Sequence, residues 1–214
     1  MADVEISNET VSNDASSKPT NSRGQILEHA LELFSRHGYD GVGIAQIVAA
    51  SGITKPTLYY FFHNKEGLFN AIIEEYYAPF NNGLREACRY APCPQSYEHD
   101  VHPVLVRVCE YMYDSARENR DFFVLRVSLE SAPPVAHATL AALPHTREQL
   151  DIVDAMFVSM AAVHGGIRGR ERLLAAHFIA CVNADIASWI RDESTLDHET
   201  ALATVRQFMH GIFS

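Results

Sequence analysis

The segment from Ile44 to Lys65 constrains this chain most, because it carries the stop signal of one short helix followed at once by the start signal of another. Gly52 can adopt the left-handed conformation that ends a helix in a tight turn. Thr54 can cap the next helix with its hydroxyl, and Pro56 falls in the first turn, where a missing N–H costs no hydrogen bond. Two short helices joined in this way form a helix-turn-helix, whose second helix can enter a DNA major groove.

Apolar residues at helical spacing extend this unit on both sides. A preceding helix would end at Gly38, and Asn64 can cap a long fourth helix that runs toward Arg89, with a kink expected at Pro79. The residues expected to form a small three-helix core are Ile26, Leu27, Ala30, Leu31, Phe34, Ile47, Leu58 and Phe62.

The rest of the chain keeps helical periodicity, with no alternating strand pattern and no internal repeat. We expect helices at 101–119, 121–130, 134–164 with a break at Pro144, 170–191 and 197–213. The predicted fold is therefore all-α, with about nine helices in an N-terminal helix-turn-helix domain and a C-terminal ligand-binding and dimerisation domain. The predicted divisions are a flexible polar arm at 1–22, a DNA-binding domain at 23–69 and a body at 70–214.

The distribution of charge fits a protein that touches DNA with one small surface. The net charge is −10, yet the stretch from Gly41 to Lys65 contains no Asp or Glu. Residues 71–214 hold 12 Arg and no Lys against 19 Asp and Glu. An acidic body with one acid-free, basic segment argues against sequence-blind coating of nucleic acid.

Residues 26–69 resemble the DNA-binding region of the TetR/AcrR family of bacterial transcriptional regulators. The resemblance is carried by Gly38-Tyr39, Ile47, Gly52-Ile53-Thr54-Lys55, Thr57-Leu58-Tyr59, Phe62, Lys65-Glu66 and Leu68. The chain departs from the family at Val42-Gly43, where the family usually has Thr or Ser before its second helix. The resemblance implies a homodimer that binds a palindromic double-stranded DNA operator, most simply as a repressor, and releases it when a small, largely apolar effector enters the body.

Eight side chains are predicted to contact DNA. Long donors at the rim of the groove suit phosphates, whereas side chains nearer the helix centre can reach base edges. We assign Lys55, Tyr59 and Lys65 to phosphates and Pro56, Thr57 and Tyr60 to base edges, with Thr54 and His63 completing the set. The alternative for the tyrosines is that they pack within the domain.

The last two predicted helices are candidates for the dimer interface. Small residues would allow one helix to approach its neighbours closely, and the other carries an apolar stripe. The small residues are Ala175, Ala176, Ala180, Ala184, Ala187 and Ser188, and the stripe is Ala201, Val205, Phe208 and Ile212. An internal hairpin is the alternative that spacing alone leaves open.

An effector pocket is expected in the body, which has more large rings and thioethers than a small bundle needs. The predicted pocket residues are Tyr111, Phe123, Met156, Met160, His164 and Phe178. The alternative for each of them is a plain core residue, which is the more frequent role of aromatic and Met side chains at helical spacing. His177 and Cys181 share one helix face, but two ligands do not make a metal site, so neither metal nor cofactor is predicted.

Other classes of protein are less consistent with the sequence. Cys88, Cys93, Cys109 and Cys181 lack metal-ligand or CxxC spacing and suit reduced thiols in a cytoplasmic protein, although a redox role stays open. The most apolar stretch, 173–190, is interrupted by Asn183 and Asp185, which opposes a membrane span. No acid, base, nucleophile and orienter come together, which opposes an enzyme. A constitutive DNA-binding or protein-interaction module without ligand response is the remaining alternative.

Overall fold

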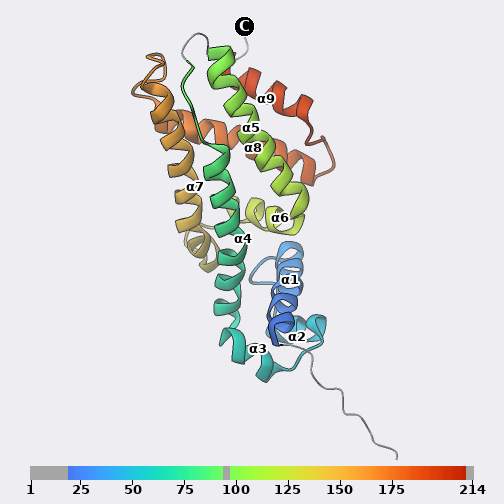
Figure 1. Cartoon of the computed structure of the whole chain (residues 1–214). Helices are drawn as coiled ribbons and strands as arrows, with labels where there is room; N and C mark the ends of the chain where they lie inside the picture. Colours follow the sequence, from blue (N-terminus) through green and yellow to red (C-terminus); the bar gives the residue numbers. More distant parts are fainter. Residues whose placement is uncertain (1–18, 94–96, 211–214) are drawn as a thin grey trace, which may run out of the picture.

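The structure is a computed structural model that describes residues 19–93 and 97–210, and within these ranges the chain forms helices and loops without a strand (Figure 1). The helices of the described residues are α1 (Pro19–His37), α2 (Ile44–Ser51), α3 (Lys55–Phe62), α4 (Lys65–Ala87), α5 (Tyr97–Glu118), α6 (Arg120–Glu130), α7 (His137–Ala161), α8 (Glu171–Ile190) and α9 (His198–His210). The predicted all-α fold is confirmed.

Two parts of the molecule lie at opposite ends of α4 (Figure 1). We call α1 to α3 the head and α5 to α9 the body. Helix α4 has 23 residues, so at a rise of about 1.5 Å per residue it spans roughly 35 Å, from the head to the far end of the body. One rigid element therefore touches both the helix-turn-helix and the body core.

The head follows the predicted start and stop signals. Gly38 ends α1 with φ of 70°, and Gly52 ends α2 with φ of 63°, both in the left-handed region. Asn64 caps α4, its Oδ1 accepting the Gly67 N–H at 2.7 Å. Gly43 cannot cap α2 with a side chain, but Gln46 Oε1 accepts the Gly43 N–H at 2.7 Å. That reverse bond supplies half of a capping box at the position that departs from the family pattern.

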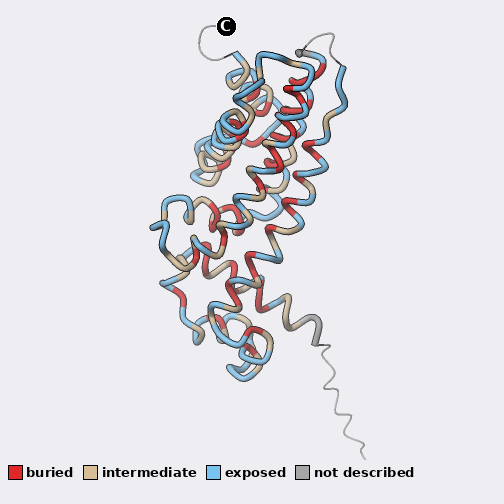
Figure 2. The backbone as a smooth tube through the Cα atoms, turned by 90° about the vertical axis from the view of Figure 1, so that its left-hand side faces the viewer, coloured by how far each residue is buried: buried red, intermediate tan, exposed pale blue. Residues whose placement is uncertain are grey.

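The predicted head core is confirmed, because all eight of its residues are buried. Phe34 stacks edge-on against Phe69 of α4 at 5.4 Å between ring centroids, which continues this core onto the long helix. Figure 2 shows buried positions recurring along α4 and through the body in the same way. The head and body thus share one continuous apolar core.

In the body, α8 packs mainly against α7, which also lies along α4, whereas α9 packs mainly against α5. The apolar stripe of α9 faces inward: Ala201 and Val205 are fully buried, and the Phe208 ring lies 5.2 Å from that of Phe178. Asp185 of α8 accepts hydrogen bonds from Tyr113 of α5 and Thr204 of α9. This polar bridge accounts for a carboxylate within the most apolar helix. The last stripe residue, Ile212, lies outside the described residues.

The predicted helices are confirmed, with ends that shift by a few residues, but the predicted break at Pro144 is wrong. Helix α7 runs through Pro144 without interruption. An interior proline removes one hydrogen bond and costs about 3 kcal/mol. Packing of α7 against both α4 and α8 outweighs that cost, and sequence spacing could not reveal it. Helix α1 begins at Pro19, so the predicted arm overlaps its first turn, and residues 1–18 of that arm lie outside the described residues.

Candidate nucleic-acid interface and body cavity

The turn between α2 and α3 holds α3 at the surface of the head. The Ile53 N–H reaches back to the Val48 carbonyl at 3.3 Å, and Thr54 Oγ1 accepts the Thr57 N–H at 3.4 Å. Thr54 and Thr57 also join their hydroxyls at 2.9 Å. Pro56 lies in the first turn of α3, where the helix needs no N–H. These bonds cap the N-terminus of α3, and the exposed Thr54, Lys55 and Pro56 lie at the positive end of its helix dipole.

Helix α3 has one buried and one exposed side. Leu58 and Phe62 are buried in the head core, as predicted. Tyr60 is 78% exposed and Tyr59 is 45% exposed, so neither ring is buried in the head core. The remaining predicted DNA contacts are exposed at Thr54, Lys55, Pro56 and His63 and half-buried at Thr57 and Lys65. The two neighbouring tyrosine rings are therefore available to a partner surface.

Lys65 has a second role besides the predicted phosphate contact. Its Nζ lies 4.2 Å from the centre of the Tyr39 ring, a cation–π distance. Tyr39 also packs against Phe69 at 4.9 Å and against His137 of α7 at 5.2 Å. Lys65 thus lies where the head, α4 and the start of α7 meet. Lys55, by contrast, is exposed at the outer end of α3.

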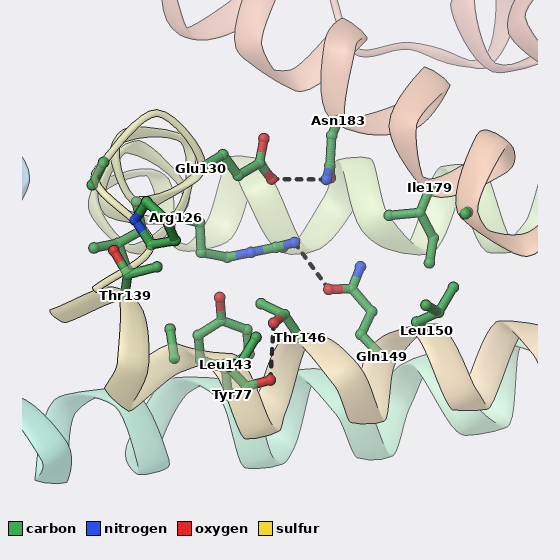
Figure 3. A pocket seen from close by; sticks show the side chains of 15 residues that line it. Tyr77, Arg126, Glu130, Thr139, Leu143, Thr146, Gln149, Leu150, Ile179 and Asn183 are labelled. Carbon is green, nitrogen blue, oxygen red and sulfur yellow. Dashed lines mark hydrogen bonds between the residues drawn. The ribbon is translucent and has the colours of Figure 1, made fainter. Parts of the chain in front are cut away.

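A cavity of about 510 Å³ lies in the body between α4, α6, α7 and α8 (Figure 3). Its apolar wall consists of Leu129, Ala132, Pro134, Ala142, Leu143, Leu150, Ala176 and Ile179, and its polar wall of Tyr77, Arg126, Glu130, Thr139, Thr146, Gln149 and Asn183. A mostly apolar cavity of this size with a few polar groups is typical of small-molecule sites between helices. We call it the body cavity.

Arg126 crosses the body cavity between the Glu130–Asn183 pair and Gln149 (Figure 3). Burial raises the pKa of Tyr77, and the nearby Arg126 charge offsets part of that effect. Burial also raises the pKa of Glu130, with Arg126 again acting in the opposite direction. The Glu130 carboxylate accepts the Asn183 amide N–H at 2.9 Å. The cavity therefore combines a cation with a carboxyl group that ionises less readily than usual.

The predicted pocket residues do not gather around one site. Phe123, Met160 and Phe178 are buried in the core, and Tyr111 donates its hydroxyl to the Phe80 carbonyl at 2.8 Å. His164 lines a second cavity of about 490 Å³ that Phe157 and Phe208 also border, whereas Met156 lines a third, more open one. Within the described residues, none of the six lines the body cavity. Their contact with an effector stays a prediction.

His164 belongs to a buried polar cluster with Asp100 and Tyr90. Asp100 Oδ2 accepts the Tyr90 hydroxyl at 2.7 Å and lies 2.6 Å from His164 Nε2. Burial opposes ionisation of Asp100, but the hydrogen bonds from His164 and Tyr90 hold its pKa below the usual value. This cluster connects the start of α5 to the loop after α7 and to the segment after α4, which is a structural role.

The buried cysteines have low thiol reactivity. Burial raises the pKa of both Cys88 and Cys109 to about 12, so neither forms a thiolate readily at neutral pH. Burial also raises the pKa of Cys181. Cys93 is exposed. A redox role that pairs Cys88 with Cys93 would first have to uncover the Cys88 thiol.

Sequence reasoning missed Arg126, Gln149 and Asn183, which converge on the body cavity from three helices. One signal was present for the first of them: Arg126 interrupts the apolar run Phe122-Phe123-Val124-Leu125 and would lie on its inward face. A charge at such a position is rare unless it has a partner. Gln149 and Asn183 gave no comparable signal, because their burial depends on how α7 and α8 pack.

Comparison with known proteins identifies the head. The family described as bacterial regulatory proteins, tetR family, matches residues 26–72. The transcriptional repressor ComR of Escherichia coli strain K12 is 46% identical over 54 residues, which cover 25% of this chain and 26% of ComR. The transcriptional activator FasR of Mycolicibacterium smegmatis is 24% identical over 191 residues, or 88% of this chain and 81% of FasR. The match thus spans about a quarter of ComR but most of FasR.

Solved structures extend the likeness to the whole fold. The transcriptional regulator FadR from Bacillus subtilis, solved in complex with stearoyl-CoA, superposes with a TM-score of 0.72 over 88% of this chain and 98% of FadR, at 16% identity. At that identity the likeness establishes the fold, which includes the helical body that the family description does not cover. Residues 26–72 are a TetR-family DNA-binding domain, and the chain that carries them has the helical fold of the FadR regulator.

Proposed function

We propose that this protein is a repressor that acts as a homodimer in the bacterial cytoplasm and leaves a palindromic operator when a small, largely apolar effector enters each body. The observation that carries the proposal is that α4 connects α3, with its exposed side, to the body cavity. Tyr77 of the cavity wall lies 12 residues beyond Lys65, about 18 Å along the helix at 1.5 Å per residue. The mechanism requires no catalytic step.

A second helix also connects cavity and head. Helix α6 carries Arg126 in the cavity wall and packs against α1 of the head. Ser35 of α1 donates its hydroxyl to Asp121 at the start of α6 at 3.2 Å. Arg23 of α1 forms an ion pair with Glu75 of α4 at 3.0 Å. An effector that shifts α4 or α6 would therefore tilt the head, and its coupling energy equals its differential affinity for the two conformers.

Dimerisation is proposed through the outer face of α8, with α9 at its edge. The most apolar window of α8 has a mean hydropathy of 1.5, yet only 22% of it is buried. Its outward row is Leu173, His177, Ala180 and Ala184, spaced at helical intervals. Small residues allow a second α8 to approach closely, and burial of Leu173 would favour the pairing. The inward stripe of α9 is already covered within the subunit, so α9 would contribute its other faces.

The relatives support regulation by a ligand without fixing its direction. ComR is a repressor and FasR an activator, while FadR was solved with stearoyl-CoA. We favour repression because binding of a dimer across an operator can block transcription without further contacts. Two recognition helices on one dimer would read half-sites separated by about 34–36 Å or a multiple of it.

The test combines operator selection with an interface variant. DNA selected from a random pool by the wild-type protein should contain an inverted repeat. Ala180→Glu would bury an unpaired carboxylate between subunits, so it should sediment as a monomer and bind the selected operator at least tenfold more weakly. Ala91→Glu, at an exposed alanine after α4, introduces the same charge away from α8 and should behave as wild type.

Three results would contradict the proposal: selected DNA without two-fold symmetry, a monomeric wild-type protein at micromolar concentration, or an Ala180→Glu variant that stays dimeric. A constitutive module predicts a different outcome in one further assay. If the protein is a constitutive module, no compound in a metabolite screen should raise its melting temperature. An effector, by contrast, stabilises the folded protein by mass action and should also release the operator.

A further inference from the structure

The body cavity contains a cation that forms no direct ion pair among the described residues, although the Glu130 carboxyl group lies near enough to interact with its charge. Arg126 is 4% exposed, and its Nη2 donates one hydrogen bond to Gln149 Oε1 at 3.1 Å. Its Nε and Nη1 are buried and make no hydrogen bond. Among the described residues, no Asp or Glu forms an ion pair with this guanidinium. A charge withdrawn from water and left without its hydrogen bonds is costly, so such a group calls for a partner.

The rings around Arg126 meet only part of that need. The guanidinium carbon lies 4.8 Å from the Phe123 ring centre, 5.0 Å from that of Phe80 and 5.6 Å from that of Tyr77. Ring faces attract a cation but accept none of its in-plane hydrogen bonds. Aromatic walls also keep the group dry, which strengthens any contact it makes with an anion. The rings therefore hold the guanidinium in place, and the Tyr77 hydroxyl also interacts with it, but N–H donors remain available to a ligand.

Two other polar groups of the cavity also lack partners. Gln149 is 2% exposed and its Nε2 makes no hydrogen bond, nor does Thr139 Oγ1. Figure 3 shows the Gln149 amide beside the Arg126 guanidinium, with Leu150 and Ile179 beyond them. Two donors from different helices, Arg126 of α6 and Gln149 of α7, thus meet next to an apolar wall. The donors exceed the acceptors at this point, which suits a ligand oxygen with a negative charge.

We infer that the body cavity binds an organic carboxylate, with its acid group on Arg126 and Gln149 and its apolar portion along Leu150 and Ile179. The guanidinium is the side chain best matched to a carboxylate, because its planar donors can bond both oxygens. Glu130 restricts the choice: it lies on the opposite side of Arg126, where it would repel a second acid group on the ligand. The ligand is therefore a monocarboxylate. This inference rests on the proposed function and names the class of its effector.

The test compares head groups on one apolar chain. Binding to the full-length protein is measured by calorimetry for decanoate and for decan-1-ol, with a branched and an aromatic monocarboxylate as additional acid probes. Wild type should prefer the acid to the alcohol by about ten- to a hundredfold, the range expected for hydrogen bonds to a charged group. Arg126→Met keeps an apolar stem of similar length, and it should lose this preference while binding the alcohol at least as well.

Matched variants distinguish the effect of the Arg126 guanidinium on binding from the effects of net charge and of altered folding stability. Arg147→Met removes an exposed arginine of α7 that lies outside the cavity wall, so it should keep the wild-type preference. Arg126→Lys should retain part of it, because the charge remains without the fork. The melting temperature of Arg126→Met should not fall, since an unpaired buried charge has been removed. If that variant fails to fold, the head-group preference of wild type decides alone.

Several outcomes would overturn the inference: equal binding of acid and alcohol by wild type, no binding of any acid probe at millimolar concentration, or an unchanged preference in Arg126→Met. Operator affinity is measured on the same samples without ligand. A protein that binds a palindromic operator but shows no acid preference refutes the effector class and leaves the regulator intact. A protein that prefers the acid but binds no operator refutes the proposed function instead.

Discussion

The head and the body are both helical and share one core, yet they place their functional groups in opposite ways. In the head, most of the side chains predicted to contact DNA lie on or beside one eight-residue helix, α3, whose buried residues Leu58 and Phe62 are apolar. In the body, the polar groups that line the cavity come from α4, α6, α7 and α8, and three of them, Tyr77, Arg126 and Gln149, are buried. The DNA-binding site in the head is formed by one continuous segment of sequence. The body cavity is formed by packing of segments that are distant in the sequence.

This difference determines what each region tolerates. Exposed side chains on α3 contribute little to folding, so they can change with the operator while Leu58 and Phe62 hold the helix in place. Arg126 and Gln149 are both part of the core and part of the cavity, so a change at either alters packing and binding together. The head should therefore separate stability from recognition, whereas the body should not.

The largest expected effect tests whether the head can unfold while the body stays folded. Leu58→Ala removes a fully buried side chain from α3 and should cost about 2–5 kcal/mol. Because α2 and α3 are short, the loss should appear as local opening of the head and abolish operator binding. Amide hydrogen exchange should then rise in α1 to α3 with little change in α5.

Leu105→Ala is the matched variant, since Leu105 is equally buried in α5 of the body. It should cost a similar amount and leave operator affinity nearly intact below the melting temperature. If both variants lose protection across the whole chain to the same extent, the head and body form one cooperative unit and the comparison fails at the level of stability.

A smaller effect tests the exposed side of α3. Tyr60→Ala should weaken operator binding by about 1–3 kcal/mol, the value of a base-edge contact, and relax preference at one position of each half-site. Its melting temperature should stay near that of wild type, because Tyr60 is 78% exposed. A mobility-shift titration against operator and scrambled DNA measures both quantities. Equal affinity of variant and wild type for the operator would displace Tyr60 from the interface.

Lys55→Ala should have a weaker and non-selective effect. Loss of one phosphate contact should reduce the slope of log affinity against log salt by about 0.9 on B-DNA. Operator and scrambled DNA should be affected alike. Lys55 suits this test better than Lys65, whose ammonium also lies on the Tyr39 ring and so contributes to the junction between head and body. A selective loss on the operator alone would assign Lys55 to a base.

The same contrast explains how far the sequence was informative. The caps at Thr54 and Asn64 and the turn at Gly52 act within a few residues, so local chemistry predicted the head and its exposed row. In the body, the helices were predictable from periodicity, but which helices pack against each other was not. Phe123 and Phe178 have the same rings whether they pack in a core or line a cavity, and only tertiary contacts distinguish the two. Pro144 within α7 was mispredicted for the same reason.

The smallest expected effect concerns acid, and it also separates the regions. The caps of α3 and α4 are a hydroxyl and an amide, neither of which titrates, whereas α9 is capped by the carboxylate of Asp197. Asp197 accepts hydrogen bonds from Thr195 and Thr200, which lower its pKa to about 2. Because the folded pKa lies below the unfolded value of about 3.9, the contribution of this carboxylate is complete above that value and is lost as the pH falls toward about 2. The difference in melting temperature between wild type and Asp197→Asn should therefore shrink from pH 6 to pH 3, while that for Asn64→Ala in the head should stay constant. A gap that is independent of pH for Asp197→Asn would show that its hydrogen bonds, and not its charge, hold the start of α9.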